Sequence, residues 1–207
     1  MNAIVLLPSI FGVVLSFTLK AQVLLNVDLK KSTPQNCEIE IQNEGIKLIN
    51  TSKKTALLWL DGVNFNNGII ELDLKGKDVR GESFLGVAFH ALNDSTYSAV
   101  YFRPFNFAST ERKRYAVQYI DLPGHDWNIL RDKHPGMYES AVNPVPDPTD
   151  WFHAKIVVNF PEIKVYVNQS AEPSLVVKKI STQQNGKIAL WMDSRDGWFR
   201  NLQIVNK

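Results

Sequence analysis

Short stretches in which apolar and polar residues alternate recur along most of the chain. They are rich in Val, Ile, Tyr and Phe and are separated by clusters of Gly, Asn, Asp and Pro, a pattern typical of antiparallel strands joined by tight turns. The pattern predicts strands over residues 37–42, 45–50, 55–60, 68–74, 83–91, 97–103, 115–120, 152–159, 163–168, 175–180, 186–192 and 199–205. About a dozen short strands with almost no helical periodicity between them predict an all-β fold, a two-sheet antiparallel β-sandwich of the jelly-roll type.

The segment 121–150 departs from this pattern. It contains prolines at positions 123, 135, 144, 146 and 148 and shows neither a clear strand nor a clear helix pattern. Loops of this length are uncommon in compact domains and are usually functional or disordered. Because the segment also holds the apolar residues Trp127, Leu130 and Tyr138, we expect an ordered flap over one edge of a sheet.

The first residues form an apolar run, from Ile4 to Phe17, of the length of a signal-peptide core. We expect a signal peptide over residues 1–21, cleaved after Ala21, followed by one domain over residues 22–207. A buried N-terminal strand and an uncleaved anchor stay open as alternatives, although the run is shorter than the ~20 residues that a transmembrane helix needs. After cleavage we expect a secreted or periplasmic protein without a membrane segment.

Charge and cysteine content narrow the classes of partner. The formal net charge is +2, from 23 basic and 21 acidic residues, so no large field of one sign attracts nucleic acid. The basic cluster at positions 112–114 is interpreted as a solvated loop. A chain with one cysteine, Cys37, has no intramolecular disulfide, and we expect this residue to be a buried small hydrophobe.

The sequence predicts neither a metal nor a cofactor. Histidines at positions 90, 125, 134 and 153 match no zinc signature. Calcium would suit the many oxygen ligands of segment 121–150, but no EF-hand-type loop is present. The oligomeric state is left open.

Alternation sorts each predicted strand into an inward and an outward set. In 83–91 the outward set includes Gly86 and Ala88, two small residues that would leave space above the backbone. If the central strands share one sheet, its open face carries Glu71, Asp73, His90, Tyr101, Arg103, Gln118 and Trp191. Such a mixture suits a sugar, whose hydroxyl groups need donors and acceptors and whose C–H faces stack on rings. The alternative is an ordinary solvated face of an antiparallel sheet.

Several stretches resemble a known group of proteins. Residues 81–90, 99–107, 116–120, 150–153 and 186–191 resemble secreted bacterial proteins of the concanavalin A-like lectin/glucanase superfamily, and among them the family-16-like glycoside hydrolase or 3-keto-disaccharide hydrolase domains. The resemblance implies the sandwich fold and carbohydrate as the partner. It does not decide the activity, since this superfamily contains lectins, binding modules and hydrolases.

The same resemblance offers candidate catalytic residues. Family-16 glucanases carry Glu-x-Asp-x-x-Glu on a strand, or a form one residue shorter. Here Glu71 and Asp73 match the first two positions, whereas Gly76, or Lys75 in the shorter form, stands in place of the third carboxylate. Glycoside hydrolysis ordinarily needs two carboxyl groups. A further acid from Glu82, Glu139 or a loop aspartate is therefore needed if Glu71 and Asp73 do not suffice.

We thus expect a carbohydrate-active protein that binds, and in one hypothesis hydrolyses, a glycan or disaccharide on the open face. In the enzyme hypothesis Glu71 and Asp73 are catalytic, and His90, Tyr101, Arg103, Gln118 and Trp191 position the sugar. Two alternatives remain, a non-catalytic lectin-like module and a protein-interaction module that docks a partner through Trp191, Tyr101 and Trp127.

Overall fold

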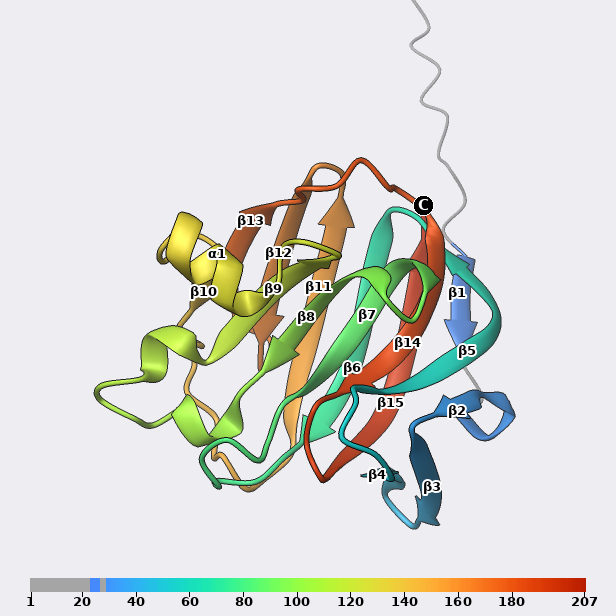
Figure 1. Ribbon diagram of the computed structural model, residues 1–207. Coiled ribbons are helices and arrows are strands. Elements are labelled where there is room, and N and C mark those ends of the chain that lie inside the picture. The colour runs from blue at the N-terminus through green and yellow to red at the C-terminus, as the bar shows by residue number, and fades with distance from the viewer. Residues whose placement is uncertain (1–22, 27–28) are drawn as a thin grey trace, which may run out of the picture.

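A computed structural model describes residues 23–26 and 29–207. Figure 1 shows two sheets stacked face to face, with a short helix at one edge. The predicted signal peptide over residues 1–21, and the predicted start of the domain at residue 22, lie outside the described residues. Within the described ranges, no helix has the length and hydropathy needed to cross a membrane.

All strand pairs in the described residues are antiparallel, and the strands form two sheets. Sheet A contains, in order across the sheet, β13 (Leu175–Lys178), β12 (Glu162–Val167), β11 (Phe152–Asn159), β6 (Gly68–Lys75), β15 (Asp196–Asn206), β4 (Gly45–Asn50) and β3 (Cys37–Gln42), with β1 (Val23–Asn26) also paired to β15. Sheet B contains β10 (Glu139–Ser140), β9 (Val117–Leu122), β8 (Thr96–Phe102), β7 (Leu85–Asn93), β14 (Gly186–Met192), β5 (Ala56–Phe65) and β2 (Thr33–Gln35). This arrangement confirms the predicted two-sheet antiparallel sandwich, and every predicted strand range overlaps an observed strand.

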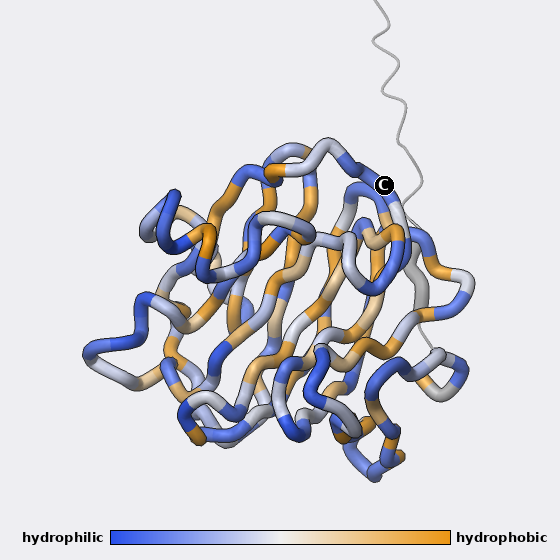
Figure 2. The backbone as a smooth tube through the Cα atoms, viewed as in Figure 1, coloured by the Kyte–Doolittle hydropathy of each residue, from blue (hydrophilic) through white to orange (hydrophobic). Residues whose placement is uncertain are grey.

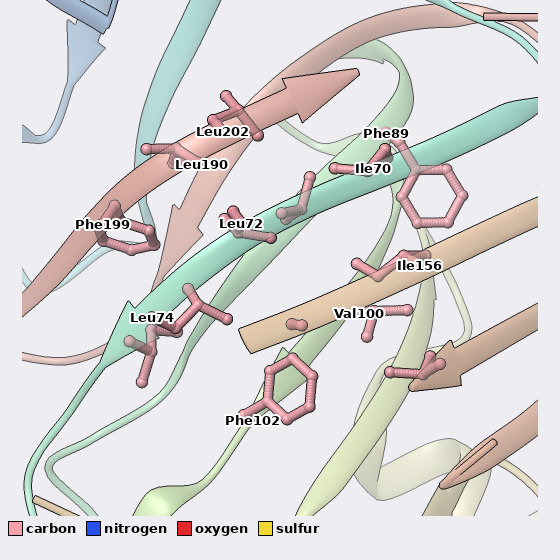
Figure 3. Packing of buried hydrophobic residues seen from close by; sticks show 14 of the residues in the cluster. Ile70, Leu72, Leu74, Phe89, Val100, Phe102, Ile156, Leu190, Phe199 and Leu202 are labelled. Carbon is pink, nitrogen blue, oxygen red and sulfur yellow. The ribbon is translucent and has the colours of Figure 1, made fainter. Parts of the chain in front are cut away.

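The core lies between the sheets, and the predicted inward sets are found there. Ile70 and Leu72 of β6 meet Phe89, Val100 and Phe102 of β7 and β8 (Figure 3), all without exposed surface. Hydrophobic residues follow the strands while hydrophilic residues gather at the turns (Figure 2). The alternation read from the sequence therefore identifies the face of each strand that is removed from water.

Cys37 belongs to the same core, as expected. It is 8% exposed, and its thiol lies 3.7 Å from the Leu57 carbonyl oxygen, to which it donates a weak hydrogen bond. Burial raises the pKa of this thiol, so Cys37 is a packing residue rather than a reactive one.

The segment 121–150 is ordered and lies along the edge of sheet B, as expected of a flap. It contains two elements that the sequence pattern does not reveal, α1 (Trp127–Lys133) and β10, which pairs with β9. Asp126 caps the helix, because its carboxylate accepts a hydrogen bond of 2.7 Å from the Trp127 amide. A helix of seven residues is too short to show a clear 3.6-residue periodicity. The described residues also form 3-10 helices at η1 (Leu29–Lys31), η2 (Pro104–Asn106) and η3 (Lys113–Tyr115).

A buried polar cluster ties the connection from β13 to β14 onto sheet B. Lys179 donates hydrogen bonds of 2.5 Å to the hydroxyl groups of Ser98 and Ser181, and its ammonium lies 3.5 Å from an Asp121 carboxylate oxygen. Asp121 also accepts a hydrogen bond from the Ser181 amide at 2.6 Å. The Lys179 and Asp121 side chains are 1% and 2% exposed, and burial lowers the pKa of Lys179. Each of these two buried charges is therefore stabilised by the other.

We predict that Asp121→Asn strongly destabilises the fold, because it keeps the side-chain shape but leaves the Lys179 charge buried without a counter-ion. The expected loss in free energy of unfolding is about 3–5 kcal/mol, measured by denaturant titration. Glu162→Gln is the control, because it breaks an exposed pair with Lys164 and should change stability little. Equal effects of the two substitutions would contradict the role given to the buried pair.

Candidate functional site

A cavity of about 570 Å³ opens on the outer face of sheet B, the face turned away from the core. We call it the outer cavity. It is bounded by β8, β9 and β14 below, by the segments 80–84 and 105–115 at the sides, and by the start of α1. Its lining residues are Thr55, Arg80, Gly81, Phe84, Tyr97, Tyr101, Arg103, Phe105, Asn106, Arg112, Tyr115, Ile120, Leu122, Asp126, Trp127, Arg131, Trp191 and Asp193.

The floor of the outer cavity contains two aromatic rings that meet across a glycine. Gly86 of β7 lies opposite Tyr101 on one neighbouring strand and Trp191 on the other. The two rings stack with centroids 4.6 Å apart and an interplanar angle of 26°. A Cβ on Gly86 would lie 2.0 Å from the Val100 carbonyl oxygen, so only glycine fits. The expectation that Gly86 leaves open space is therefore wrong, because the rings and the adjacent backbone occupy it.

Arg103 lies between aromatic rings at the inner end of the outer cavity. Its guanidinium stands 4.9 Å from the Tyr101 ring centroid and 5.8 Å from that of Phe84. It donates hydrogen bonds to the Tyr101 hydroxyl at 2.7 Å and the Tyr115 carbonyl at 2.9 Å. Both terminal guanidinium nitrogens of Arg103 also donate hydrogen bonds of 3.4 Å to the Gln118 amide oxygen. Arg103 is thus held rigidly by neutral groups.

The wall formed by α1 is fixed by an ion pair. Arg131 binds both carboxylate oxygens of Glu139, at 3.0 and 2.5 Å. The Arg131 guanidinium also stacks 4.1 Å from the Tyr115 ring centroid and 4.9 Å from that of Trp127. This bidentate pair joins α1 to β10 and holds Trp127 at the cavity, although that ring remains 43% exposed.

Two aspartates line another part of the outer cavity. Asp126 extends from the N-terminus of α1, and Asp193 directly follows β14. Asp193 is open to water, yet it is recessed among protein atoms. Desolvation raises the pKa of Asp193, and the charge of Asp126 raises it further. The two carboxylates are therefore close enough to repel each other, and one of them holds a proton more readily than an isolated aspartate does.

The structure brings together only part of the predicted site. Tyr101, Arg103 and Trp191 line the outer cavity as expected. Gln118 points to the same face, as expected, but it is 1% exposed and donates to the Tyr138 carbonyl at 3.0 Å. It positions Arg103 and the flap instead of meeting a ligand.

The expected place of His90 on the open face is wrong. Its φ of 52° breaks the alternation at a register shift in β7, so the imidazole stacks on Phe65 and packs edge-on against Phe89, with centroids 5.8 and 5.1 Å apart. Nε2 donates a hydrogen bond of 2.6 Å to the Asn66 carbonyl. Burial lowers the pKa of His90 to about 4, which makes it a neutral packing residue at neutral pH.

The expectation that Glu71 and Asp73 share a face with Tyr101 and Arg103 is also wrong, because β6 belongs to sheet A. Their carboxylates lie on the outer side of that sheet, across the sandwich from the outer cavity. There they have partners. Asp73 lies 2.9 Å from His153 Nδ1 and accepts a hydrogen bond of 2.7 Å from Asn201.

Glu71 lies 3.5 Å from the Lys155 ammonium. Although burial alone would raise the pKa of Asp73, hydrogen bonds from His153 and Asn201 lower it. Cross-strand pairs of this kind are usual on a solvated sheet. A catalytic role for Glu71 and Asp73 stays a prediction.

Sequence reasoning missed several residues of the outer cavity. Asp126 and Arg131 belong to the flap, whose order we expected but whose side chains the sequence pattern does not place. Arg112 was assigned to a solvated loop, yet its guanidinium lines the cavity and donates to Asn106 at 3.2 Å. No sequence pattern pointed to Asp193, since a single aspartate after a strand is common. Asp126, which stands directly before the apolar residue Trp127, could have indicated the cap of α1.

The described part of the chain contains no group of three or more His, Cys, Asp or Glu side chains arranged to hold a metal ion. The aspartate pair of the outer cavity supplies only two carboxylates. The chemistry visible in the cavity is therefore that of aromatic rings, guanidinium groups and carboxyl groups.

Comparison with solved structures finds related sandwiches. The carbohydrate-binding module CBM66 from Bacillus subtilis has a TM-score of 0.62 and 14% identity, covering 84% of this chain and 94% of that one. A Bacillus subtilis protein of unknown function with a galectin-like fold has a TM-score of 0.58 and 13% identity, covering 86% and 90%. The exoplasmic/lumenal domain of VIP36 has a TM-score of 0.54 and 10% identity, covering 86% and 84%. No curated protein matches the sequence.

These comparisons show that the chain shares its two-sheet antiparallel β-sandwich fold with these solved structures. The chain belongs to the 3-keto-alpha-glucoside-1,2-lyase-like domain family, whose sequence pattern matches residues 21–205. This confirms the resemblance to the 3-keto-disaccharide hydrolase domains that was noted in the sequence.

We predict that Gly86→Ala disrupts the floor of the outer cavity, because the added methyl group collides with the backbone of β8. Overpacking of this kind should lower the free energy of unfolding by about 1–3 kcal/mol and alter the near-UV circular dichroism of the Tyr101–Trp191 stack. Gly197→Ala is the control, since its added methyl group would meet only side-chain atoms, the nearest at 3.1 Å, and it should change stability and spectrum less. Unchanged stability and spectrum in Gly86→Ala would refute the prediction.

Proposed function

We propose that this chain binds a saccharide in the outer cavity and cleaves it by proton transfer through Asp126 and Asp193. The observation that carries the proposal is a cavity lined by aromatic rings into which two interacting carboxyl groups project. Aromatic rings suit the C–H faces of a sugar, and carboxyl groups serve as its proton donors and acceptors.

The comparisons support carbohydrate as the ligand. The family takes its name from a lyase acting on 3-keto-alpha-glucosides. CBM66 is a carbohydrate-binding module, and the VIP36 domain was solved in a form bound to Ca²⁺ and Man3GlcNAc. These descriptions apply to those proteins, and they support carbohydrate as the ligand proposed for this chain.

A 3-keto-glucoside can be cleaved without water or a redox partner. The C3 ketone acidifies the hydrogen on C2, so a carboxylate can remove that proton. The electron pair left on C2 then forms the C1=C2 double bond while the C1–O glycosidic bond breaks. The departing oxygen takes a proton from an acid, and the atoms balance as one unsaturated keto sugar and one alcohol. The site therefore needs one base and one acid.

The two aspartates can divide these roles. Because its pKa is raised by burial and by Asp126, Asp193 retains a proton to higher pH and serves as the acid. Asp126 already accepts the Trp127 amide hydrogen and serves as the base. A carboxyl group whose environment raises its pKa commonly takes the role of the acid, as proposed here for Asp193.

A second candidate function is binding without cleavage. It is favoured by the likeness to CBM66, a binding module of which 94% is covered by this chain at a TM-score of 0.62. In that case the aspartates would only accept hydrogen bonds from sugar hydroxyl groups. Turnover measurements separate the two functions.

We predict that Asp193→Asn and Asp126→Asn each lower kcat on a 3-keto-α-glucoside by about 100-fold or more, since each removes a proton-transfer group. The dissociation constant of the saccharide should change much less. Product release by the wild-type protein and both variants is followed by chromatography, and binding by calorimetry. Asn at position 126 still caps α1, so a loss of activity does not come from a frayed helix.

Asp132→Asn is the matched control, because it removes an exposed carboxylate from the same helix outside the outer cavity. It should leave turnover unchanged. If Glu71→Gln abolishes turnover while the Asp126 and Asp193 variants keep it, catalysis lies on sheet A and the proposal is wrong. If the wild-type protein binds saccharides without turnover, the binding function holds instead.

The interaction between the aspartates gives a prediction about pH. The pKa of Asp193 should lie above the usual value of about 3.9, and it should fall in Asp126→Asn because the repelling charge is gone. In that variant, any activity that needs protonated Asp193 should therefore fall at a lower pH than in the wild-type protein. Carbon-13 NMR titration of the Asp193 carboxyl group measures the shift directly. A midpoint that stays the same in Asp126→Asn and in Asp132→Asn would disprove the coupling.

A further inference from the structure

Arg103 is a buried charge without an acidic partner. The residue is 5% exposed, and its hydrogen bonds go to the Tyr101 hydroxyl, the Tyr115 carbonyl and the Gln118 amide oxygen. Among the described residues no carboxylate forms an ion pair with it. Glu139 is close enough to act on Arg103 electrostatically, but it is bound at both oxygens by Arg131. A buried charge in this condition is costly.

A second arginine belongs to the same hydrogen-bond network. The Tyr115 carbonyl accepts from Arg103 at 2.9 Å and from the Asn106 amide at 3.2 Å. The Asn106 oxygen in turn accepts from Arg112 Nε at 3.2 Å. The only acidic contact of Arg112 in the described chain is with Glu111 at 3.8 Å, and Glu111 is 85% exposed. Two guanidinium groups are thus held in one network by neutral groups.

Elsewhere in the described ranges, charges that are buried, or that neutralise a buried partner, are paired. Lys179 lies beside Asp121, and Arg131, on the same cavity wall, has a bidentate carboxylate partner. The missing partner at Arg103 is therefore a local property of the outer cavity. Burying an unpaired cation costs free energy, and an anion from outside the chain would offset that cost at Arg103. Arg112, whose side chain is 34% exposed and lies 3.8 Å from Glu111, is a second cation in the same network.

The acidic groups of the outer cavity do not supply that anion. Neither Asp126 nor Asp193 forms an ion pair within the described ranges. Burial and mutual repulsion raise the pKa of Asp193, whereas a nearby guanidinium would lower it. The cavity thus has an acidic part at Asp126 and Asp193 and a basic part at Arg103 and Arg112.

We propose that the saccharide bound in the outer cavity carries a negatively charged group, a carboxylate or a sulfate ester, which Arg103 and Arg112 bind. The inference rests on the proposed function and adds the substrate class. The planar fork of each guanidinium can donate two parallel hydrogen bonds to such a group. In this orientation the acidic group lies at the arginines, and the bond to be cleaved lies at the aspartates.

The test compares saccharides that differ only in charge. Calorimetry measures the binding of methyl glucoside against methyl glucuronide, and of a glucan oligosaccharide against its 6-O-sulfated form. The charged member of at least one pair should bind about tenfold more tightly or better, as expected for charge-assisted hydrogen bonds in a recessed site. Its affinity should also weaken with added salt more than that of the neutral member. Which pair shows the preference distinguishes a carboxylate from a sulfate ester.

The matched variants are Arg112→Gln and Lys113→Gln. Both remove one positive charge from neighbouring positions, but Lys113 is exposed and does not line the outer cavity. Arg112→Gln should remove most of the preference for the charged saccharide, whereas Lys113→Gln should keep it. Arg103→Lys keeps the charge but loses the planar fork, and it should weaken the charged ligand more than the neutral one.

The outcomes separate this inference from the proposed function. Equal affinity for charged and neutral saccharides, or a preference that survives Arg112→Gln, overturns the inference while saccharide binding stands. A 3-keto-α-glucoside is added as the substrate of the proposed function, and if neither it nor any saccharide of the panel binds, the proposed function and the inference both fail. A preference that disappears in Arg112→Gln and persists in Lys113→Gln supports both.

Discussion

The packing of the two sheets through their inner faces is the interaction on which the rest of this structure depends. Each central strand gives one face to that core, so only the outward faces and the connecting segments remain for a site. On sheet A, outward carboxylates such as Asp73 find partners on neighbouring strands. On sheet B, the outward face carries aromatic rings, and the segments 80–84, 105–115 and 121–150 border it. The two faces of one sandwich therefore have different chemistry.

The stack of Tyr101 on Trp191 shows how closely this chemistry depends on the backbone. The rings come from strands separated by β7 and meet because Gly86 has no side chain. Burial of the rings leaves their surroundings apolar, and in such surroundings a charge needs a partner. Arg131 has one in Glu139. Arg103 forms no ion pair among the described residues, so the outer cavity contains a buried positive charge without a carboxylate partner.

The distribution of charge connects the fold with the proposed chemistry. An acidic pair at one part of the outer cavity and two arginines at another would orient a saccharide that carries an acidic group. Proton transfer and binding would then use different residues. The α1 helix takes part in both, because Asp126 caps it and Arg131 anchors it to β10.

By itself the sequence determined which segments are strands and which of their side chains face the core, because two-residue alternation is a local property of the chain. The outward direction of Tyr101, Arg103 and Trp191 followed from the same rule. Only the tertiary structure decided that β6 lies in the other sheet, which separates Glu71 and Asp73 from the cavity, since strand order depends on long-range pairing. It also decided the turn of His90 at a positive φ and brought Asp126 and Asp193 to one cavity. These two aspartates are 67 positions apart, the difference of their sequence numbers, and no local pattern records that they line the same cavity.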